Sequence, residues 1–178
     1  MAEQDRERLL SGLSQETGMF SRRVAEAQRM GENEIGTRVI QASIEIHREL
    51  GPGLLESVYE VVLARELTGR GLKVARQVPV PIEYKGIRFD EGFRADLIIE
   101  DKVILELKSV EHVSPAHKKQ VQTYLKLTGC KLGYLLNFGE AVLRTGITRC
   151  VNGLEENPLC ASAPLREKRT DFFPPSDM

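Results

Sequence analysis

Cysteine is scarce in the 178-residue chain and net charge is nearly absent, at −1. Cys130, Cys150 and Cys160 are odd in number and form no Cys-x-x-Cys pair, which argues against a disulfide framework and against a zinc site. The small net charge gives no overall attraction to nucleic acid or to an acidic membrane. A nucleic-acid partner would therefore have to be held by a local patch or through a metal ion.

A long apolar run is also missing. No segment approaches the roughly 18 apolar residues of a membrane span, and the N-terminus is charged where a signal peptide would be apolar. We therefore expect a cytoplasmic protein without a membrane partner. With 41% hydrophobic and 29% charged residues, the chain is long enough for one domain with a real core and too short for two.

The two ends of the chain differ from its middle. Residues 1–33 are polar and only patchily periodic, and residues 158–178 hold four of the eight prolines. We expect residues 1–33 to be a weakly ordered or helical extension, residues 34–157 to be the domain, and residues 158–178 to be a tail. An alternative is an integral helix near residues 20–30, which would offer a contact for a homodimer.

Helical and strand-like patterns alternate within the middle. Apolar residues at helical spacing predict helices over residues 35–50 and 55–70, and in the second of these Leu55, Val58 and Leu67 fall on the face that we expect to be buried. Ser114 and Pro115 begin a third helix. Strands are predicted over residues 74–84, 93–99, 103–110, 130–138 and 146–151.

Charged residues interrupt two of these strands, in the stretch ADLIIEDKVILELKS of residues 95–109. Glu106 and Lys108 lie two residues apart and so point to the same side of their strand. A two-residue turn would put Asp96 on the opposite side from Glu106, whereas a three-residue turn at residues 100–102 pairs Asp96 with Glu106. Only the three-residue turn leaves the other face of both strands apolar.

Two opposed carboxylates repel each other, and a divalent cation such as Mg²⁺ or Mn²⁺ would relieve that repulsion. Lys108 on the same face can orient or deprotonate a metal-bound water, as hydrolysis of a phosphodiester requires. Glu-x-Lys on a strand more often forms a solvent-facing ladder, in which charged side chains of neighbouring strands alternate in sign. Glu56 on an upstream helix, with Gln120 and Tyr124 on the helix after Lys108, favours the site.

Two segments resemble known families. GLLESVY, residues 53–59, resembles the signature of the GxxExxY proteins, and RAD to ELKS followed by KKQVQTYL resembles the PD-(D/E)xK nuclease superfamily, which includes that family. The resemblance covers residues 33–153. It implies an α/β restriction-endonuclease-like core, with a mixed sheet flanked by helices in the order αβββαβ. Ala95 stands where the superfamily motif has proline.

The resemblance implies a divalent-metal-dependent nuclease that uses Mg²⁺ or Mn²⁺ and acts on nucleic acid. It does not carry over a substrate, and we expect DNA. It makes Asp96 and Glu106 metal ligands and Glu56 a helix-borne acid that joins them. Lys108 would be the catalytic lysine, and Gln120 the polar residue of the next helix. The alternative is a catalytically inactive nucleic-acid or protein-binding module on the same fold.

Further candidates surround this set. His47 would either contact a phosphate or compensate the dipole at the end of its helix. Tyr59 and Tyr124 are expected to pack and to hold Glu56 or Gln120 with their hydroxyl groups. Surface lysines are usually only solvated, but three of them could form a phosphate-binding edge beside the site: Lys118, Lys119 and Lys126.

Overall fold

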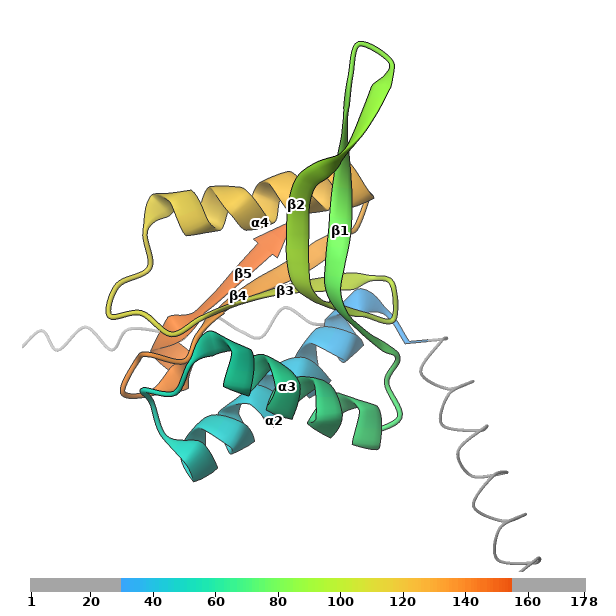
Figure 1. The fold of residues 1–178 in the computed structure, drawn as a ribbon. Coiled ribbons are helices and arrows are strands. Elements are labelled where there is room, and N and C mark those ends of the chain that lie inside the picture. The colour runs from blue at the N-terminus through green and yellow to red at the C-terminus, as the bar shows by residue number, and fades with distance from the viewer. Residues whose placement is uncertain (1–29, 155–178) are drawn as a thin grey trace, which may run out of the picture.

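The computed structural model of the chain describes residues 30–154 (Figure 1). The tail expected over residues 158–178, and the N-terminal extension up to residue 29, lie outside this range. Within it the elements follow the order ααβββαβ, then a short 3-10 helix, Leu143–Gly146, and a last strand. No helix in this range is both long enough and apolar enough to cross a membrane.

Within residues 30–154, five strands form one mixed sheet in the order β1-β2-β3-β4-β5. β3 and β4 are parallel, and all other neighbouring strands are antiparallel. Their bounds are Val74–Tyr84, Ile87–Ile99, Val103–Lys108, Leu132–Asn137 and Ile147–Val151. Pro79 and Pro81 lie in the edge strand β1, as predicted, because an edge strand can spare backbone N–H groups.

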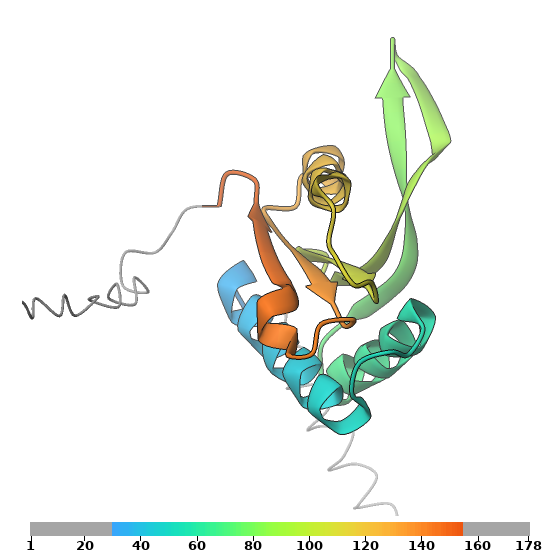
Figure 2. The ribbon, with the colours of Figure 1, turned by 90° about the vertical axis from the view of Figure 1, so that its left-hand side faces the viewer.

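Helices cover both faces of this sheet, which confirms the predicted α/β, restriction-endonuclease-like architecture. α2, Glu32–Leu50, and α3, Glu56–Gly69, lie on one side, and α4, Pro115–Thr128, lies on the other (Figures 1 and 2). The core under α2 and α3 includes five residues of β2 and β3: Leu97, Ile99, Val103, Leu105 and Leu107. Ile104 belongs instead to the cluster under α4.

The predicted turn between β2 and β3 is confirmed. Ile99 pairs with Val103 across residues 100–102, and Leu97 pairs with Leu105. Glu100 and Asp101 adopt left-handed backbone angles, with φ of 52° and 55°, which closes the turn in three residues. The register therefore puts Asp96 level with Glu106, as the alternation of charged and apolar residues required.

The predicted start of the domain is a few residues late. α2 begins at Glu32, and Met30 before it is only 4% exposed within the core. The Met30 carbonyl oxygen also accepts a 2.8 Å hydrogen bond from the Lys102 ammonium. Residues 30–33 thus belong to the folded unit and not to an extension.

The predicted buried face of α3 is partly wrong. Leu55 is 74% exposed and Val58 is 38% exposed, although Leu67 is buried as expected. The other buried side chains of the helix are Tyr59, Glu60, Leu63 and Ala64. Because apolar residues occur on every side of this helix, their spacing alone does not identify the face that packs.

Shortening the Met30 side chain should destabilise the domain. Met30→Ala leaves a cavity under the start of α2 and is expected to lower the free energy of unfolding by about 2 to 5 kcal/mol. Urea unfolding monitored by circular dichroism measures this change. Glu34→Ala is the matched control, because Glu34 is exposed and forms only a 3.3 Å surface ion pair with Arg38. Equal stability of the two variants would contradict the placement of Met30 in the core.

Candidate active site

The site lies where β2 and β3 separate. Their paired residues end at Leu97 and Leu105, and beyond this point β2 turns away with β1 into an arm that projects from the body (Figure 1). The backbone N–H of Leu107 donates to Asp96 Oδ2 at 2.8 Å. The Asp96 carboxylate thus replaces a backbone partner at the point where the strands separate.

Glu106 is the most buried acid of the site, with 2% exposure. Its Oε1 accepts a 2.7 Å hydrogen bond from Lys108 Nζ, but its Oε2 is buried with no hydrogen-bond partner among residues 30–154. Burial raises the pKa of Glu106 to about 7, and the nearby charges of Asp96 and Glu56 add to the effect against the opposing Lys108. A buried carboxylate oxygen without a partner is costly, and a bound cation would remove that cost.

The buried surroundings of the site also change the pKa values of Asp96 and Lys108. Burial raises the pKa of Asp96, although the hydrogen bond from Leu107 works against this shift. Burial disfavours the Lys108 ammonium, but its hydrogen bond and attraction to Glu106 outweigh burial and raise the Lys108 pKa. Lys108 therefore carries a proton at neutral pH, which suits a role in orienting a water or a phosphate better than a role in removing a proton.

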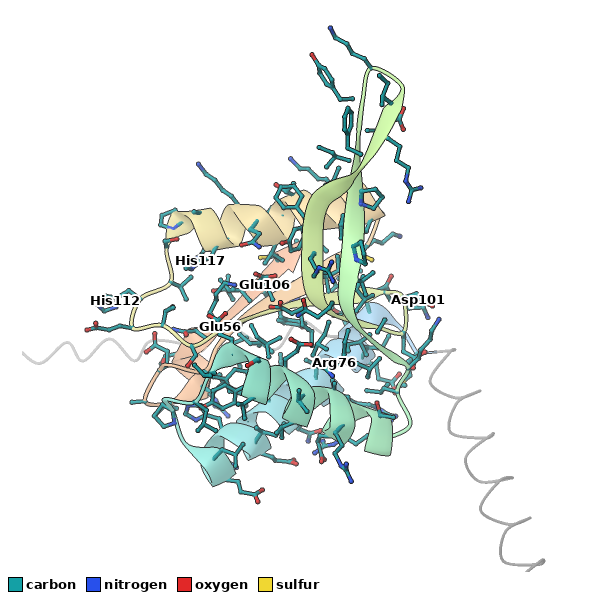
Figure 3. The ribbon with its side chains drawn as sticks, in the orientation of Figure 1. Glu56, Arg76, Asp101, Glu106, His112 and His117 are labelled. Carbon is teal, nitrogen blue, oxygen red and sulfur yellow. The ribbon has the colours of Figure 1, made fainter. Side chains whose placement is uncertain are left out.

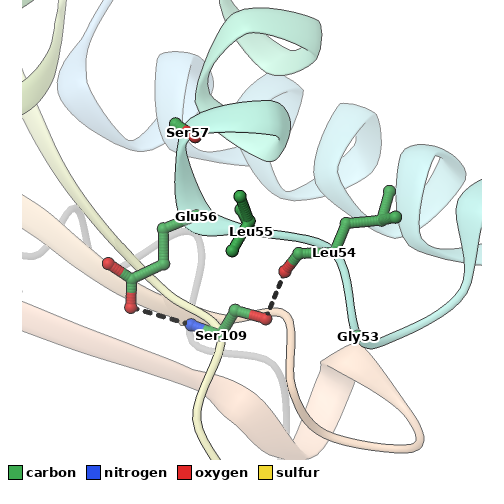
Figure 4. Close-up of a pocket in the computed structure, with 6 residues that line it drawn as sticks. All are labelled: Gly53, Leu54, Leu55, Glu56, Ser57 and Ser109. Atoms are coloured by element: carbon green, nitrogen blue, oxygen red, sulfur yellow. Dashed lines mark hydrogen bonds between the residues drawn. The ribbon is translucent and has the colours of Figure 1, made fainter.

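Glu56 is brought to the site by the first turn of α3. Its Oε1 accepts a 3.1 Å hydrogen bond from the Ser109 N–H, and Ser109 Oγ donates to the Leu54 carbonyl oxygen at 2.7 Å (Figure 4). These two bonds tie the start of α3 to the end of β3. They border an open pocket of about 550 Å³ that is lined by Gly53, Leu54, Leu55, Glu56, Ser57 and Ser109.

The two tyrosines hold different parts of the site. The Tyr124 hydroxyl accepts a 2.5 Å hydrogen bond from Gln120 Nε2 and donates to the Arg94 carbonyl oxygen at 3.3 Å, which ties α4 to β2 next to Asp96. The Tyr59 hydroxyl donates to the Gly51 carbonyl oxygen at 2.5 Å and accepts from the Leu54 N–H at 3.3 Å. Tyr59 therefore fixes the loop that leads to Glu56 and does not hold the carboxylate itself.

The carboxylate oxygens of the site are of the kind that Mg²⁺ or Mn²⁺ prefers. Among residues 30–154, no three His, Cys, Asp or Glu side chains form a ready-made metal cluster. The charge of Glu56 contributes to the raised pKa values of Asp96 and Glu106, and Glu56 lies with Glu106 in the space between α3 and α4 (Figure 3). Mg²⁺ is commonly held by one or two carboxylates together with water and substrate phosphates, which Asp96 and the unpartnered Glu106 oxygen can match.

The phosphate contact expected at His47 is wrong. His47 is 6% exposed, and its Nε2 lies 2.9 Å from the Glu140 carbonyl oxygen. Its ring also lies 6.2 Å from that of Phe138, measured between centroids. His47 therefore joins the end of α2 to the segment after β4 and is not available to a nucleic acid.

The three lysines expected to bind phosphate are exposed on α4 but do not form one group. Lys119 and Lys126 are seven residues apart, so they lie on nearly the same side of the helix. Burial raises the pKa of the Cys150 thiol and the nearby Lys118 lowers it, which places Lys118 toward β5. Lys118 is thus set apart from the side of α4 that carries Gln120.

Three residues of the site were missed by the sequence interpretation. Ser109 directly follows the Glu-x-Lys motif, and this position in the sequence is the signal that could have identified it as part of the site. Glu60 lies one turn after Glu56 on α3, which places both acids on one side of the helix. Gln77 lies in the edge strand β1 and carries no comparable signal, because its position depends on a local distortion of the backbone.

Comparison with known families agrees with this geometry. A family model described as the PD-(D/E)XK nuclease superfamily matches residues 33–150, which is more than half of the chain and contains every acid of the site. A search of curated proteins and a search of solved structures found no match.

The buried Glu106 carboxylate predicts a pH-dependent penalty on stability. Its pKa is 4.5 ordinarily and about 7 in the folded chain, so between these values the folded state keeps a proton that the unfolded state has lost. The free energy of unfolding must therefore fall as pH rises through this window. Glu106→Gln escapes the penalty and should exceed the wild type by about 1 to 3 kcal/mol at pH 8.

The measurement is urea unfolding in EDTA at pH 4.5 and pH 8. The advantage of Glu106→Gln should nearly vanish at the lower pH, because both side chains are then neutral. Glu66→Gln is the control, since Glu66 is an exposed acid on α3 that is paired with Arg70. An advantage that is independent of pH would show that Glu106 is not held as described.

Proposed function

The chain belongs to the PD-(D/E)XK nuclease superfamily, and we propose that it is a divalent-metal-dependent nuclease of the GxxExxY group that hydrolyses phosphodiester bonds in DNA. The observation that carries the proposal is the environment of Glu106. Its buried Oε2 has no hydrogen-bond partner among residues 30–154, its Oε1 accepts from the Lys108 ammonium, and the Asp96 carboxylate lies nearby. A solvent-facing ladder of charges would not bury one of its acids without a partner.

Asp96 and Glu106 are the residues that would hold Mg²⁺ or Mn²⁺. When bound, the ion acts as a Lewis acid that polarises the scissile phosphate and lowers the pKa of a bound water. Lys108 donates hydrogen bonds toward the attacking water or a phosphate oxygen, where its positive charge opposes the negative charge that develops. The hydrogen bond from Ser109 to Glu56 fixes the position of the start of α3 beside the site. The hydrogen bond from Gln120 to Tyr124 fixes the side of the site next to α4.

The superfamily implies a nucleic-acid substrate, and the choice of DNA over RNA is part of the proposal. A substrate phosphate would approach clustered acids in the metal-free protein, so binding should need the cation that reverses the local charge. A binding module without catalysis would instead hold nucleic acid equally well in EDTA.

Asp96→Ala tests the metal site. Wild-type chain should be stabilised by Mn²⁺, by about 2.7 kcal/mol when the ion is at 100 times its dissociation constant, and Asp96→Ala should lose most of that gain. Thermal unfolding with and without Mn²⁺ measures the stabilisation. Cleavage of single-stranded and duplex DNA and of RNA, with Mg²⁺ or Mn²⁺ against EDTA, measures the activity that the same variant should lose.

Lys108→Ala is the companion variant. It removes a positive charge and no ligand, so Mn²⁺ should still stabilise the protein while cleavage falls by a factor of about a hundred or more. Normal cleavage by either variant would contradict the role proposed for that residue. Binding of nucleic acid that is equal in EDTA and Mg²⁺, with no cleavage by wild type, would favour the binding module.

Lys119 and Lys126 should contribute to binding of the phosphate backbone. The double variant Lys119→Ala with Lys126→Ala is expected to weaken DNA binding in Mg²⁺ and to reduce the slope of log affinity against log salt by about two. Fluorescence anisotropy across a salt series measures both. Lys118→Ala is the control on the same helix, because Lys118 lies toward β5. Equal effects of all three lysines would mean that the contact is not localised.

A further inference from the structure

A distortion in β1 lies level with Asp96. Arg76 pairs with Leu97 and Val78 pairs with Ala95, which puts Gln77 opposite Asp96, but the Gln77 backbone is left-handed with φ of 50°. Only glycine adopts this conformation readily, and Gln77 lies inside a strand and not in a turn. Such a conformation is maintained only where the surroundings compensate for it.

The distortion changes where two consecutive side chains point. In a regular strand, Arg76 and Gln77 would project to opposite faces. Here both reach the same carboxylate on α3, because Arg76 Nε donates to Glu60 Oε1 at 2.9 Å and Gln77 Nε2 donates to Glu60 Oε2 at 2.7 Å. Figure 3 shows Arg76 between β1 and α3. Glu60 is 6% exposed, so this anchor is largely removed from solvent.

The same amide group reaches the active site. Gln77 Nε2 lies 3.4 Å from Asp96 Oδ1, while Asp96 Oδ2 is held by the Leu107 N–H at 2.8 Å. Both oxygens of Asp96 are thus contacted by donors from the strands on its two sides. The carbonyl oxygen of Gln77 accepts from Arg94 Nη1 at 3.4 Å, which holds the distorted backbone from β2 as well.

We infer that Gln77, anchored by Glu60 and Arg76, is a positioning residue that orients the Asp96 carboxylate for the metal ion. This inference rests on the proposed function. Gln77 is the uncharged member of a row that crosses three strands, Gln77 on β1, Asp96 on β2 and Glu106 on β3. It separates the Asp96 carboxylate from that of Glu60, and without a donor between them these two carboxylates would face each other directly.

Gln77→Gly isolates the side-chain amide. Glycine accepts the left-handed backbone, so the substitution removes the amide without adding strain. Residues that orient metal ligands typically change metal affinity or activity by 10-fold to 100-fold when they are removed. We expect the dissociation constant for Mn²⁺, titrated into nucleic-acid-free protein and followed by electron paramagnetic resonance, to rise about tenfold or more. In cleavage assays, kcat should fall while KM for DNA stays nearly constant.

Two comparisons separate positioning from loss of structure. Asp101→Gly relieves a similar left-handed residue, with φ of 55°, in the turn between β2 and β3, and it should leave Mn²⁺ affinity unchanged. Gln77→Asn keeps an amide and tolerates the left-handed backbone, and it should recover part of the lost affinity. Thermal unfolding shows that each variant is folded.

The outcomes distinguish this inference from the proposed function. Wild type that binds Mn²⁺ but cleaves no nucleic acid would refute the proposed function, and the affinity ratio between wild type and Gln77→Gly would still decide the inference. Folded Gln77→Gly with wild-type Mn²⁺ affinity overturns the inference. Wild type that binds no Mn²⁺ overturns both.

Discussion

The hydrogen bond from the Leu107 N–H to Asp96 Oδ2 is the contact on which the site depends. A pair of antiparallel strands normally satisfies its backbone donors with backbone carbonyl groups, and the separation of β2 from β3 would leave this donor buried and unpaired. The Asp96 side chain satisfies it. The strands can therefore separate at a defined residue without leaving the Leu107 N–H unpaired.

The cost of this arrangement is electrostatic. Asp96 and Glu106 are partly removed from water, and burial raises the pKa of each. Lys108 compensates only one oxygen of Glu106, and the other has no partner among the residues described. Natural sites accept such destabilisation where function requires it, because a residue that is fully satisfied by the protein has no capacity left for a ligand.

The sequence predicted the parts of this site that follow from side-chain alternation. Glu106 and Lys108 had to share a face, and only a three-residue turn could bring Asp96 to that face without exposing the apolar residues beside it. That reasoning identified the register, because a shift of one residue would have reversed every side chain. It also explains why Ile104, which shares the face of Glu106, packs under α4.

Other parts could not be predicted, for physical reasons that differ from residue to residue. α3 presents apolar residues on every side, so the burial of Glu60 depends on the sheet to which the helix docks. His47 stands at the end of a helix, where exposure is common, but its contact with the Glu140 carbonyl group arises from residues 93 positions apart. The left-handed conformation of Gln77 has no local signal, since glutamine does not favour it.

The environment that Glu106 and Lys108 share would couple metal binding at the proposed site to the release of a proton from Glu106. With a pKa of about 7, Glu106 is partly protonated at neutral pH, whereas Lys108 keeps its own proton. A divalent cation at the proposed site would require the ionised carboxylate, so its binding would displace the proton that Glu106 still holds. The site therefore carries less negative charge at neutral pH than a count of its acids suggests, and on the proposed function its full charge would develop only when a cation binds. This coupling reconciles a cluster of buried acids with a stable fold, because the repulsion among ionised carboxylates is greatest only when a counter-ion is present.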